Sequence, residues 1–299
     1  MHSATDEQRR AGIPPRVVEW FAQNARDLPW RRPGFSAWGV LVSEIMLQQT
    51  PVARVIPRLE RWLDRWPTPD ALAADSPAEA VRAWQSLGYP RRALALHAAA
   101  TAISEQHGGN VPDDVDALLA LPGIGDYTAR AVAAFAFGRP VPVVDVNTRR
   151  VLARAVQGQG EAGPARTRAD LATMQELLPS DPADAQAFNA GAMELGQTVC
   201  VARSPRCEAC PIAELCAWRA AGYPVYTGPA APRQARYEGS DRQVRGRIMR
   251  ALRHSDEPVP AEAIELLWPD AVQRERALAG LLRDGLAVGS PDTGYRLPG

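Results

Sequence analysis

The chain has 299 residues, 46% of them hydrophobic, and its 34 basic residues are balanced by 34 acidic ones. This composition is normal for a globular, helix-rich protein and leaves room for two domains. No stretch approaches the roughly 18 consecutive apolar residues that a membrane-spanning helix needs. The first residues are polar and lack an apolar signal core, so we expect a cytoplasmic protein.

All 34 basic residues are arginine, because the sequence contains no lysine. A GC-rich coding bias explains this composition more simply than selection for guanidinium chemistry does. In either case no lysine ε-amine is available for Schiff-base catalysis. The zero net charge argues weakly against a nucleic-acid-binding protein, although arginines can still be concentrated on one face.

Residues 13–220 have the pattern of successive helices. Apolar residues recur at spacings of three and four, as in Val40, Leu41, Ile45 and Leu47, and alternating strand patterns are scarce. We therefore predict an all-α fold for this part of the chain.

A tight turn separates two of these helices at Leu121-Pro-Gly-Ile-Gly125. Gly123 and Gly125 allow the backbone to approach a partner closely, and the amides that begin the next helix favour an anion such as a phosphate. The pattern predicts a helix-hairpin-helix over about residues 113–137 that binds the DNA backbone, with an ordinary turn between helices as the alternative.

All four cysteines fall in one short segment, as Cys200-x6-Cys207-x2-Cys210-x5-Cys216. Four thiolates at fixed short spacings are what a [4Fe–4S] cluster needs. A zinc site usually pairs two C-x2-4-C hairpins, whereas here only one such loop exists. We predict an iron–sulfur cluster, and zinc binding or a pair of disulfides are the alternatives.

A second domain follows a linker that we place at residues 221–239. Residues 240–299 contain three predicted helices and a short hairpin; their expected ranges are 242–252, 261–267, 271–282 and 288–297. Three helices followed by a hairpin resemble a winged helix, a module that often binds nucleic acid or protein. A purely structural helical cap is the alternative.

The order of these motifs resembles the endonuclease III superfamily of DNA glycosylases. The turn at 121–125, then Val144-Asp145, then the cysteine segment follow one another as in that superfamily, and the likeness spans about residues 13–220. It implies a two-lobed helical helix-hairpin-helix glycosylase fold with a cluster loop. The cluster is then structural, because hydrolysis of a glycosidic bond requires no electron transfer.

Two carboxyl groups are the expected catalytic residues. Glu44 lies in Ser-Glu-Ile-Met-Leu-Gln-Gln-Thr, which resembles the signature of the adenine DNA glycosylase (MutY) family. Burial among these apolar residues would raise its pKa towards the range of a proton donor. By the resemblance, Glu44 protonates adenine at N7 and Asp145, in polar company, stabilises or captures the sugar cation.

The resemblance also implies the remaining site residues. Tyr127 and Asn147 position Asp145 and the sugar, and Gln49 and Tyr89 wedge into the duplex as adenine is flipped out. The expected DNA-binding set is Arg31, Gln48, Gln49, Thr50, Tyr89, Gly123 and Gly125. The partner is double-stranded DNA containing A·8-oxoG or A·G mispairs, bound by a monomer in the bacterial cytoplasm at the nucleoid.

Several positions set this chain apart within the superfamily. Tyr127 stands where endonuclease III carries its lyase lysine, so we expect a monofunctional glycosylase. Val146 replaces a commoner glycine. Residues 227–299 are too short for the MutT-like domain of many family members, so we expect that domain to be absent. A thymine or uracil mismatch glycosylase of the same superfamily and a non-catalytic iron–sulfur DNA-binding protein are the alternatives.

Overall fold

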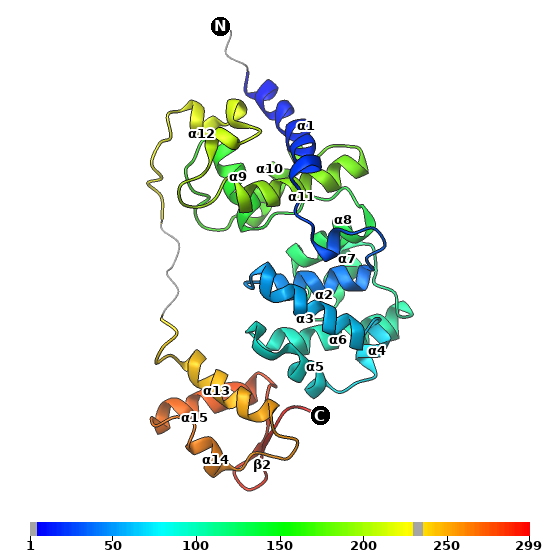
Figure 1. Cartoon of the computed structure of the whole chain (residues 1–299), viewed down its shortest axis with the longest axis vertical. Coiled ribbons are helices and arrows are strands. Elements are labelled where there is room, and N and C mark those ends of the chain that lie inside the picture. The colour runs from blue at the N-terminus through cyan, green and yellow to red at the C-terminus, as the bar shows by residue number, and fades with distance from the viewer. Residues whose placement is uncertain (1–4, 230–235) are drawn as a thin grey trace. The chain divides into compact units, whose positions relative to one another are not determined.

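The computed structural model describes residues 5–229 and 236–299 and consists of helices joined by loops (Figure 1). The chain folds into two compact units. The first unit comprises Met1–Val40, Asp113–Asp116 and Gly125–Pro232, and the second comprises Leu41–Pro112, Ala117–Ile124 and Arg233–Gly299. Within the described residues, no helix is both long enough and apolar enough to span a membrane.

The first unit is built around helices α1 and α11, whose contact is the most extensive between any two elements. Its helices are α1 (Asp6–Asn24), α8 (Asp126–Phe137), α9 (Val146–Ala155), α10 (Thr167–Leu177), α11 (Pro182–Thr198) and α12 (Ala217–Ala220), with short 3-10 turns η1 (Pro29–Arg31), η3 (Cys207–Ala209) and η4 (Ala213–Leu215).

One apolar cluster holds the first unit together. Val17 of α1, Leu152 of α9, Met174 of α10 and Leu195 of α11 are buried in it, and Ile212 of the cysteine segment joins them. The cysteine segment is therefore packed onto the same core as the helices. Removing any one of these large side chains costs about 2–5 kcal/mol in a well-packed core.

The second unit contains the remaining helices and the hairpin. Its elements are α3 (Val52–Arg65), α4 (Pro69–Ala73), α5 (Pro77–Trp84), η2 (Gln85–Leu87), α6 (Arg91–His107), α13 (Asp241–Arg253), α14 (Ala261–Glu265), α15 (Ala271–Arg283), β1 (Val288–Ser290) and β2 (Gly294–Arg296); α2 (Ala37–Leu47) and α7 (Val115–Ala120) cross the boundary between the units.

Tryptophans form the interior of the second unit between α3 and α5. Trp62 meets Trp66 and Trp84 edge to face, with ring centroids 4.6 and 5.6 Å apart. This arrangement is the favoured one for aromatic pairs, because the positive ring edge meets the negative ring face. Thr68 and Ser76 cap the helices that follow, α4 and α5, with their side-chain oxygens.

The C-terminal segment has the elements that its sequence predicts. Three helices, α13 to α15, precede an antiparallel hairpin whose register pairs Gly289 with Tyr295. Val244, Ile248 and Leu281 are among its buried residues. The helical fold with a small C-terminal hairpin is confirmed, whereas the winged-helix assignment stays a prediction. Part of the expected linker, residues 230–235, lies outside the described residues.

Within the second unit, this C-terminal segment contacts the end of α5. The Arg82 guanidinium donates to the carbonyl oxygens of Arg253 and Ser255 at 2.9 and 3.1 Å. In return, Arg253 donates to the carbonyl oxygen of Gln85 at 2.7 Å. These hydrogen bonds join two segments of the second unit that are far apart in the sequence. The predicted domain boundaries remain a prediction.

The predicted turn between helices lies between α7 and α8. Gly123 adopts a left-handed conformation with φ 73°, and a Cβ added to it would come within 2.5 Å of the Ala95 Cβ. Gly123 is therefore required on two grounds, its backbone angle and its close packing against α6. Gly125 is the N-cap residue of α8 and has no side chain with which to cap the helix.

Candidate functional site

Asp145 is the N-cap residue of α9. Its Oδ1 accepts hydrogen bonds from the backbone N–H groups of Asn147 and Thr148 at 2.9 and 2.7 Å, and its Oδ2 accepts one from Asn147 Nδ2 at 2.7 Å. An N-cap aspartate of this kind stabilises a helix by about 1 kcal/mol. The same three donors also hold the carboxylate in one orientation, so the capping role and a catalytic role are compatible.

The loop that leads to Asp145 is held by a buried side chain of α11. Asn189 accepts a hydrogen bond from Val143 N–H at 2.9 Å and donates one to the Val141 carbonyl oxygen at 3.0 Å. Tyr127, on the first turn of α8, packs against the small apolar cluster that contains Val143. Tyr127 and the approach to Asp145 therefore share one packed environment, although the role predicted for Tyr127 remains a prediction.

Asn147 is in turn fixed from the cysteine segment. Arg150 donates to Asn147 Oδ1 at 2.8 Å and to the Cys200 carbonyl oxygen at 2.7 Å. Gly196 of α11 allows this closeness, because a Cβ there would come within 2.6 Å of the Asn147 carbonyl oxygen. A chain of hydrogen bonds thus joins the cysteine segment to Asp145.

Glu44 lies on α2 and is only 5% exposed. Its neighbours along the helix, Val42, Ile45 and Met46, are buried as well. Buried acids are uncommon, so the burial of Glu44 is compatible with the catalytic role expected for it, which remains a prediction. Glu44 and Asp145 belong to different units of the structure.

Two loops of the second unit carry the predicted wedge residues. Gln49 is exposed and Tyr89 is 46% exposed, whereas Thr50 is buried and donates from Oγ1 to the carbonyl oxygens of Gln48 and Leu87 at 3.3 and 3.2 Å. Thr50 therefore joins the two loops from within. The structure brings the Gln48–Thr50 segment and the Tyr89 loop together, as a shared wedge requires.

Arg31 is engaged in an ion-pair network instead of reaching into solvent. Its guanidinium donates to Glu194 Oε2 at 2.9 Å, and Arg26 binds the same carboxylate with two hydrogen bonds of 2.5 and 2.9 Å. Burial by itself would raise the pKa of Glu194, which is 1% exposed, but the two guanidinium groups outweigh it and hold that pKa below its usual value.

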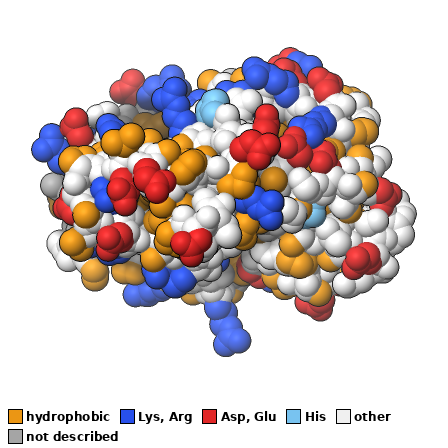
Figure 2. Space-filling view, turned by 90° about the horizontal axis from the view of Figure 1, so that it is seen from below, with side chains coloured by type: hydrophobic (Ala, Val, Ile, Leu, Met, Phe, Trp, Pro, Cys, Tyr) orange, Lys and Arg blue, Asp and Glu red, His pale blue; other side chains and the backbone are white. Residues whose placement is uncertain are grey.

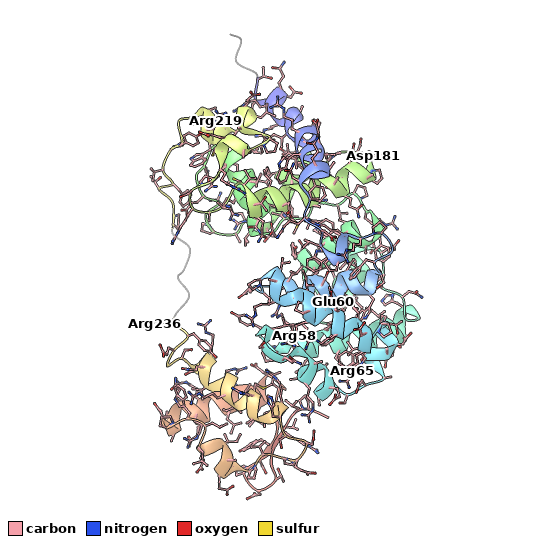
Figure 3. All side chains as sticks on the ribbon, viewed as in Figure 1. Arg58, Glu60, Arg65, Asp181, Arg219 and Arg236 are labelled. Atoms are coloured by element: carbon pink, nitrogen blue, oxygen red, sulfur yellow. The ribbon has the colours of Figure 1, made fainter. Side chains whose placement is uncertain are left out.

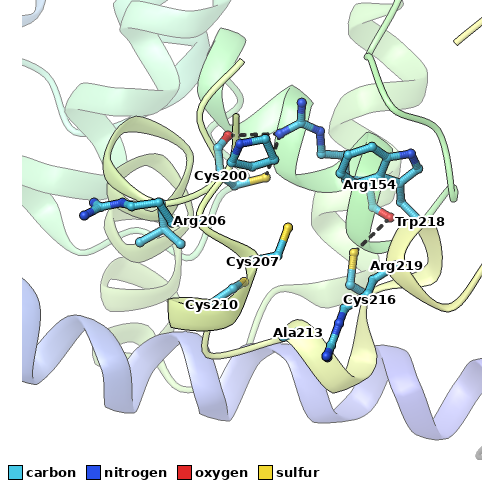
Figure 4. Close-up of a pocket in the computed structure, with 11 residues that line it drawn as sticks. Arg154, Cys200, Arg206, Cys207, Cys210, Ala213, Cys216, Trp218 and Arg219 are labelled. Carbon is cyan, nitrogen blue, oxygen red and sulfur yellow. Dashed lines mark hydrogen bonds between the residues drawn. The ribbon is translucent and has the colours of Figure 1, made fainter. Parts of the chain in front are cut away.

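The four cysteines are free thiols that line one pocket together with Arg154 and Trp218 (Figure 4). Arg219, which follows Trp218, also lines this pocket (Figure 3). Among the described residues, no three metal-binding side chains gather closely enough to hold a single ion. Free thiols around a shared pocket are the donor set that a multi-iron cluster uses.

Arg154 supports this pocket from α9. It donates to Cys200 Sγ at 3.3 Å and to the carbonyl oxygens of Gly160 and Val201 at 2.8 Å each, and its guanidinium lies 4.8 Å from the Trp218 ring centroid. Hydrogen bonds to ligand sulfur and burial are two means by which proteins tune iron–sulfur centres.

Burial also disfavours the thiolate forms that iron requires. It raises the pKa of Cys210 to about 12, with a further contribution from the neighbouring thiols and an opposing one from the Ile212 N–H. It likewise raises the pKa of Cys216. The positive charge of iron compensates for this cost, so the segment suits a cluster better than it suits free thiolates.

Comparison with known proteins identifies the family. Residues 42–176 match the model of the HhH-GPD superfamily of base excision DNA repair proteins, and residues 200–216 match the iron–sulfur binding domain of endonuclease III. The chain is 54% identical to an adenine DNA glycosylase of Mycolicibacterium smegmatis over 96% of both chains. The chain belongs to the adenine DNA glycosylase family.

A second relative agrees with this assignment, and a solved structure agrees with the fold. The adenine DNA glycosylase of Mycobacterium tuberculosis is 51% identical over 95% of this chain and 92% of its own. A solved thermostable thymine-DNA glycosylase superposes with a TM-score of 0.65 at 25% identity, over 72% of this chain and 98% of its own. Because the mycobacterial match spans 287 residues, it must include most of residues 240–299. The adenine DNA glycosylase of Mycolicibacterium smegmatis therefore shares the C-terminal segment.

The comparison confirms the cofactor prediction. The cysteine segment is an iron–sulfur binding domain of the endonuclease III type, held by Cys200, Cys207, Cys210 and Cys216 around a [4Fe–4S] cluster. Zinc binding and disulfides are thereby set aside.

Sequence reasoning missed the side chains that support this adenine DNA glycosylase site. Arg92, Arg150, Arg154 and Asn189 all bond to backbone carbonyl or amide groups distant in sequence. Nothing marks these arginines among the 34 basic residues of the chain. The sequence did contain a signal at Glu194, because it is a charged residue within the largely apolar run 187–196, and such a residue needs partners when it is buried.

Proposed function

We propose that this chain hydrolyses the N-glycosidic bond of adenine mispaired with 8-oxoguanine or guanine in duplex DNA and leaves an abasic site. One observation supports it above the others: the two carboxyl groups occupy contrasting environments. Glu44 is 5% exposed on an apolar helix, and Asp145 accepts three hydrogen bonds from neighbouring N–H groups. Burial suits a proton donor, and hydrogen bonding suits an ionised carboxylate.

The reaction follows from these environments. Glu44 donates its proton to N7 of the flipped adenine, which makes the base a better leaving group. The bond between C1′ and N9 breaks with its electron pair moving into the base. The sugar cation that remains lies against the Asp145 carboxylate, which stabilises it. Water then adds to C1′, and the proton that the water releases balances the one given by Glu44.

The helix-hairpin-helix turn is the expected contact with the DNA backbone. At the start of α8 the N-cap residue is Gly125, which has no side chain, so the backbone there can approach a phosphate closely. The face drawn in Figure 2 carries acidic and basic side chains interspersed, in keeping with the zero net charge of the chain. The Gln49 and Tyr89 loops enter the duplex while adenine is extruded, a step that costs a few kcal/mol.

The absence of lysine supports a monofunctional enzyme. Lyase activity needs an amine that attacks the sugar, and Tyr127 stands where endonuclease III carries its lysine. Only the N-terminal amine could replace it. Borohydride treatment of the protein with an abasic duplex should therefore trap no covalent adduct; a trapped adduct would contradict this part of the proposal. We further propose that the protein acts as a monomer in the bacterial cytoplasm.

A panel of duplexes tests the base preference. The full-length protein is incubated with duplexes containing A·8-oxoG, A·G, T·G or U·G, and abasic sites are then cleaved with alkali. Strand breaks in the first two duplexes are expected. Breaks confined to T·G and U·G would establish a thymine or uracil glycosylase instead, and intact strands in all four would point to a non-catalytic DNA-binding protein.

A further inference from the structure

The two wedge loops, one at Gln49 and one at Tyr89, contain backbone conformations that residues other than glycine rarely adopt. Gln49 and Tyr89 have φ values of 55° and 46°, and Gln85, at the base of the second loop, has 47°. In this left-handed region the Cβ atom lies too close to the following carbonyl oxygen. Such residues persist only where the surrounding structure enforces them, and they concentrate at functional sites.

One side chain, that of Arg92 on the first turn of α6, bonds to both loops. Its Nη1 donates to the carbonyl oxygens of Ile45, Met46 and Gln48 at 2.8, 3.2 and 2.6 Å. These three carbonyls belong to the end of α2 and to the first loop. The positive charge is well placed there, because the last carbonyls of a helix lack partners and carry partial negative charge.

The other nitrogen of Arg92 holds the second loop. Nη2 donates to the carbonyl oxygens of Leu87 and Gly88 at 3.2 and 3.0 Å, and to Thr50 Oγ1 at 3.3 Å. Because Nη1 and Nη2 belong to one rigid planar group, their separation is constant. The spacing between the two loops is therefore set by the guanidinium itself.

The groups around Arg92 suit a planar, charged guanidinium better than the side chain of lysine. Its guanidinium lies 5.2 Å from the ring centroid of Trp84 and 5.8 Å from that of Tyr89. Burial lowers its pKa to about 10, so the group stays charged at neutral pH. A lysine has the charge but only one nitrogen, whereas the guanidinium has several donors in one plane. A lysine therefore cannot donate to both loops with the same geometry.

We propose that Arg92 is a positioning residue that sets the distance between the Gln49 and Tyr89 loops, and that this distance is needed to extrude the target adenine. The proposal rests on the proposed function, because the loops act as a wedge only in a base-flipping enzyme. Arg92 bonds to carbonyl and hydroxyl groups of the protein. Its loss should therefore slow base extrusion while phosphate contacts elsewhere preserve binding to duplex DNA.

The test compares Arg92→Met and Arg92→Lys with Arg91→Lys in the full-length, iron-loaded protein. Arg91 is the matched control, since it is the neighbouring residue of α6 and is exposed, 3.4 Å from Asp284. Single-turnover cleavage of an A·8-oxoG duplex should fall about 100-fold in Arg92→Met, the effect of misplacing a group by ~1 Å. Arg92→Lys should fall by roughly 10-fold, because it keeps the charge alone, and the control should match the wild type.

Base extrusion is measured separately by the fluorescence of 2-aminopurine placed at the target adenine. The rise in fluorescence on binding should shrink in both Arg92 variants in step with the cleavage rate. Wild-type cleavage rates in both variants would overturn the proposal. So would slow cleavage with an unchanged fluorescence rise, because the defect would then lie in the chemical step.

Hydrogen exchange distinguishes positioning from general destabilisation. In Arg92→Lys, exchange of backbone amides should accelerate in residues 47–51 and 85–90 and remain unchanged in α9. Uniform acceleration along the chain would show that Arg92 merely stabilises the fold, and would overturn the proposal. This measurement needs no substrate, so it still tests Arg92 if the wild-type protein cleaves none of the duplexes and the proposed function itself fails.

Discussion

The two units of this molecule hold their candidate catalytic carboxyl groups in opposite ways. In the first unit, Asp145 caps α9 and accepts three hydrogen bonds. In the second unit, Glu44 is 5% exposed within the buried stretch of α2. The same functional group is thereby suited to two tasks, because burial favours its protonated form and hydrogen-bond donors favour its ionised form.

In each unit an arginine holds together the segments near the candidate catalytic carboxyl group. In the first unit, Arg150 joins Asn147 to the Cys200 carbonyl oxygen. In the second, Arg92 joins the ends of two loops through their carbonyl oxygens. Each arginine connects segments that are far apart in sequence, which its several rigidly arranged donors allow. In both units, therefore, a guanidinium group helps to order irregular backbone.

Replacing Glu44 with Gln should have the largest effect on cleavage, and it tests whether the two carboxyl groups have different roles. The amide has nearly the same shape but cannot donate the proton, so single-turnover cleavage of A·8-oxoG should slow by about 10²–10⁴-fold. Binding of the duplex, measured by fluorescence anisotropy, should persist. Glu60→Gln is the control, on the exposed surface of α3 (Figure 3). Normal turnover in Glu44→Gln would remove the proton-donor assignment.

Replacing Asp145 with Asn separates its two roles. An asparagine Oδ1 still accepts from the Asn147 and Thr148 amides, so α9 stays capped while the negative charge is lost. Cleavage should slow by about 10²–10³-fold, with little change in Tm. Asp181→Asn is the matched control, because Asp181 caps α11 in the same way (Figure 3). Equal activity in the two variants would show that Asp145 serves only as a cap.

Cys207→Ser tests whether the cluster is structural. The loss of one ligand should reduce iron content and visible absorption, and should lower the free energy of unfolding, because cluster binding contributes to folding. Binding to DNA should weaken with it. Ala209→Ser, an exposed position in the same 3-10 turn, is the control. A fully folded and active variant without iron would refute this role.

Glu194→Gln should have the smallest effect, on stability as a function of pH. The folded-state pKa of Glu194 is lowered, so its stabilisation is present above the usual glutamate pKa of 4.5 and is lost as pH falls through the folded value. At pH 7 the variant should lose roughly 1–3 kcal/mol, less than a fully buried pair, because Arg26 and Arg31 are 37% and 24% exposed.

Thermal unfolding between pH 3 and pH 7 measures this effect, and the wild-type and variant curves should converge at the acid end. Glu176→Gln, which breaks a surface pair with Arg10, should change the free energy of unfolding by less than about 1 kcal/mol. A constant gap between the two curves at every pH would mean that Glu194 stabilises the fold by packing and not by charge.

Much of the fold could be predicted from local sequence. The helices of the C-terminal segment begin and end within two residues of their predicted limits, at Asp241–Arg253, Ala261–Glu265 and Ala271–Arg283. Their apolar spacing and the flanking prolines and glycines are properties of neighbouring residues, which act before any tertiary contact exists. The division into interleaved units could not be predicted, because it depends on contacts between distant segments.

The sequence by itself determined the chemistry that this protein has available: four clustered cysteines, two carboxyl groups within recognisable motifs, and no lysine. Those features are residue identities and short spacings, and folding does not alter them. Only the tertiary structure decided which of the many arginines order the site, and that Arg31 pairs with Glu194. The physical reason is that a guanidinium selects its partners by three-dimensional proximity, and identical side chains look alike along the chain until the fold brings particular carbonyl oxygens and carboxylates within hydrogen-bonding distance.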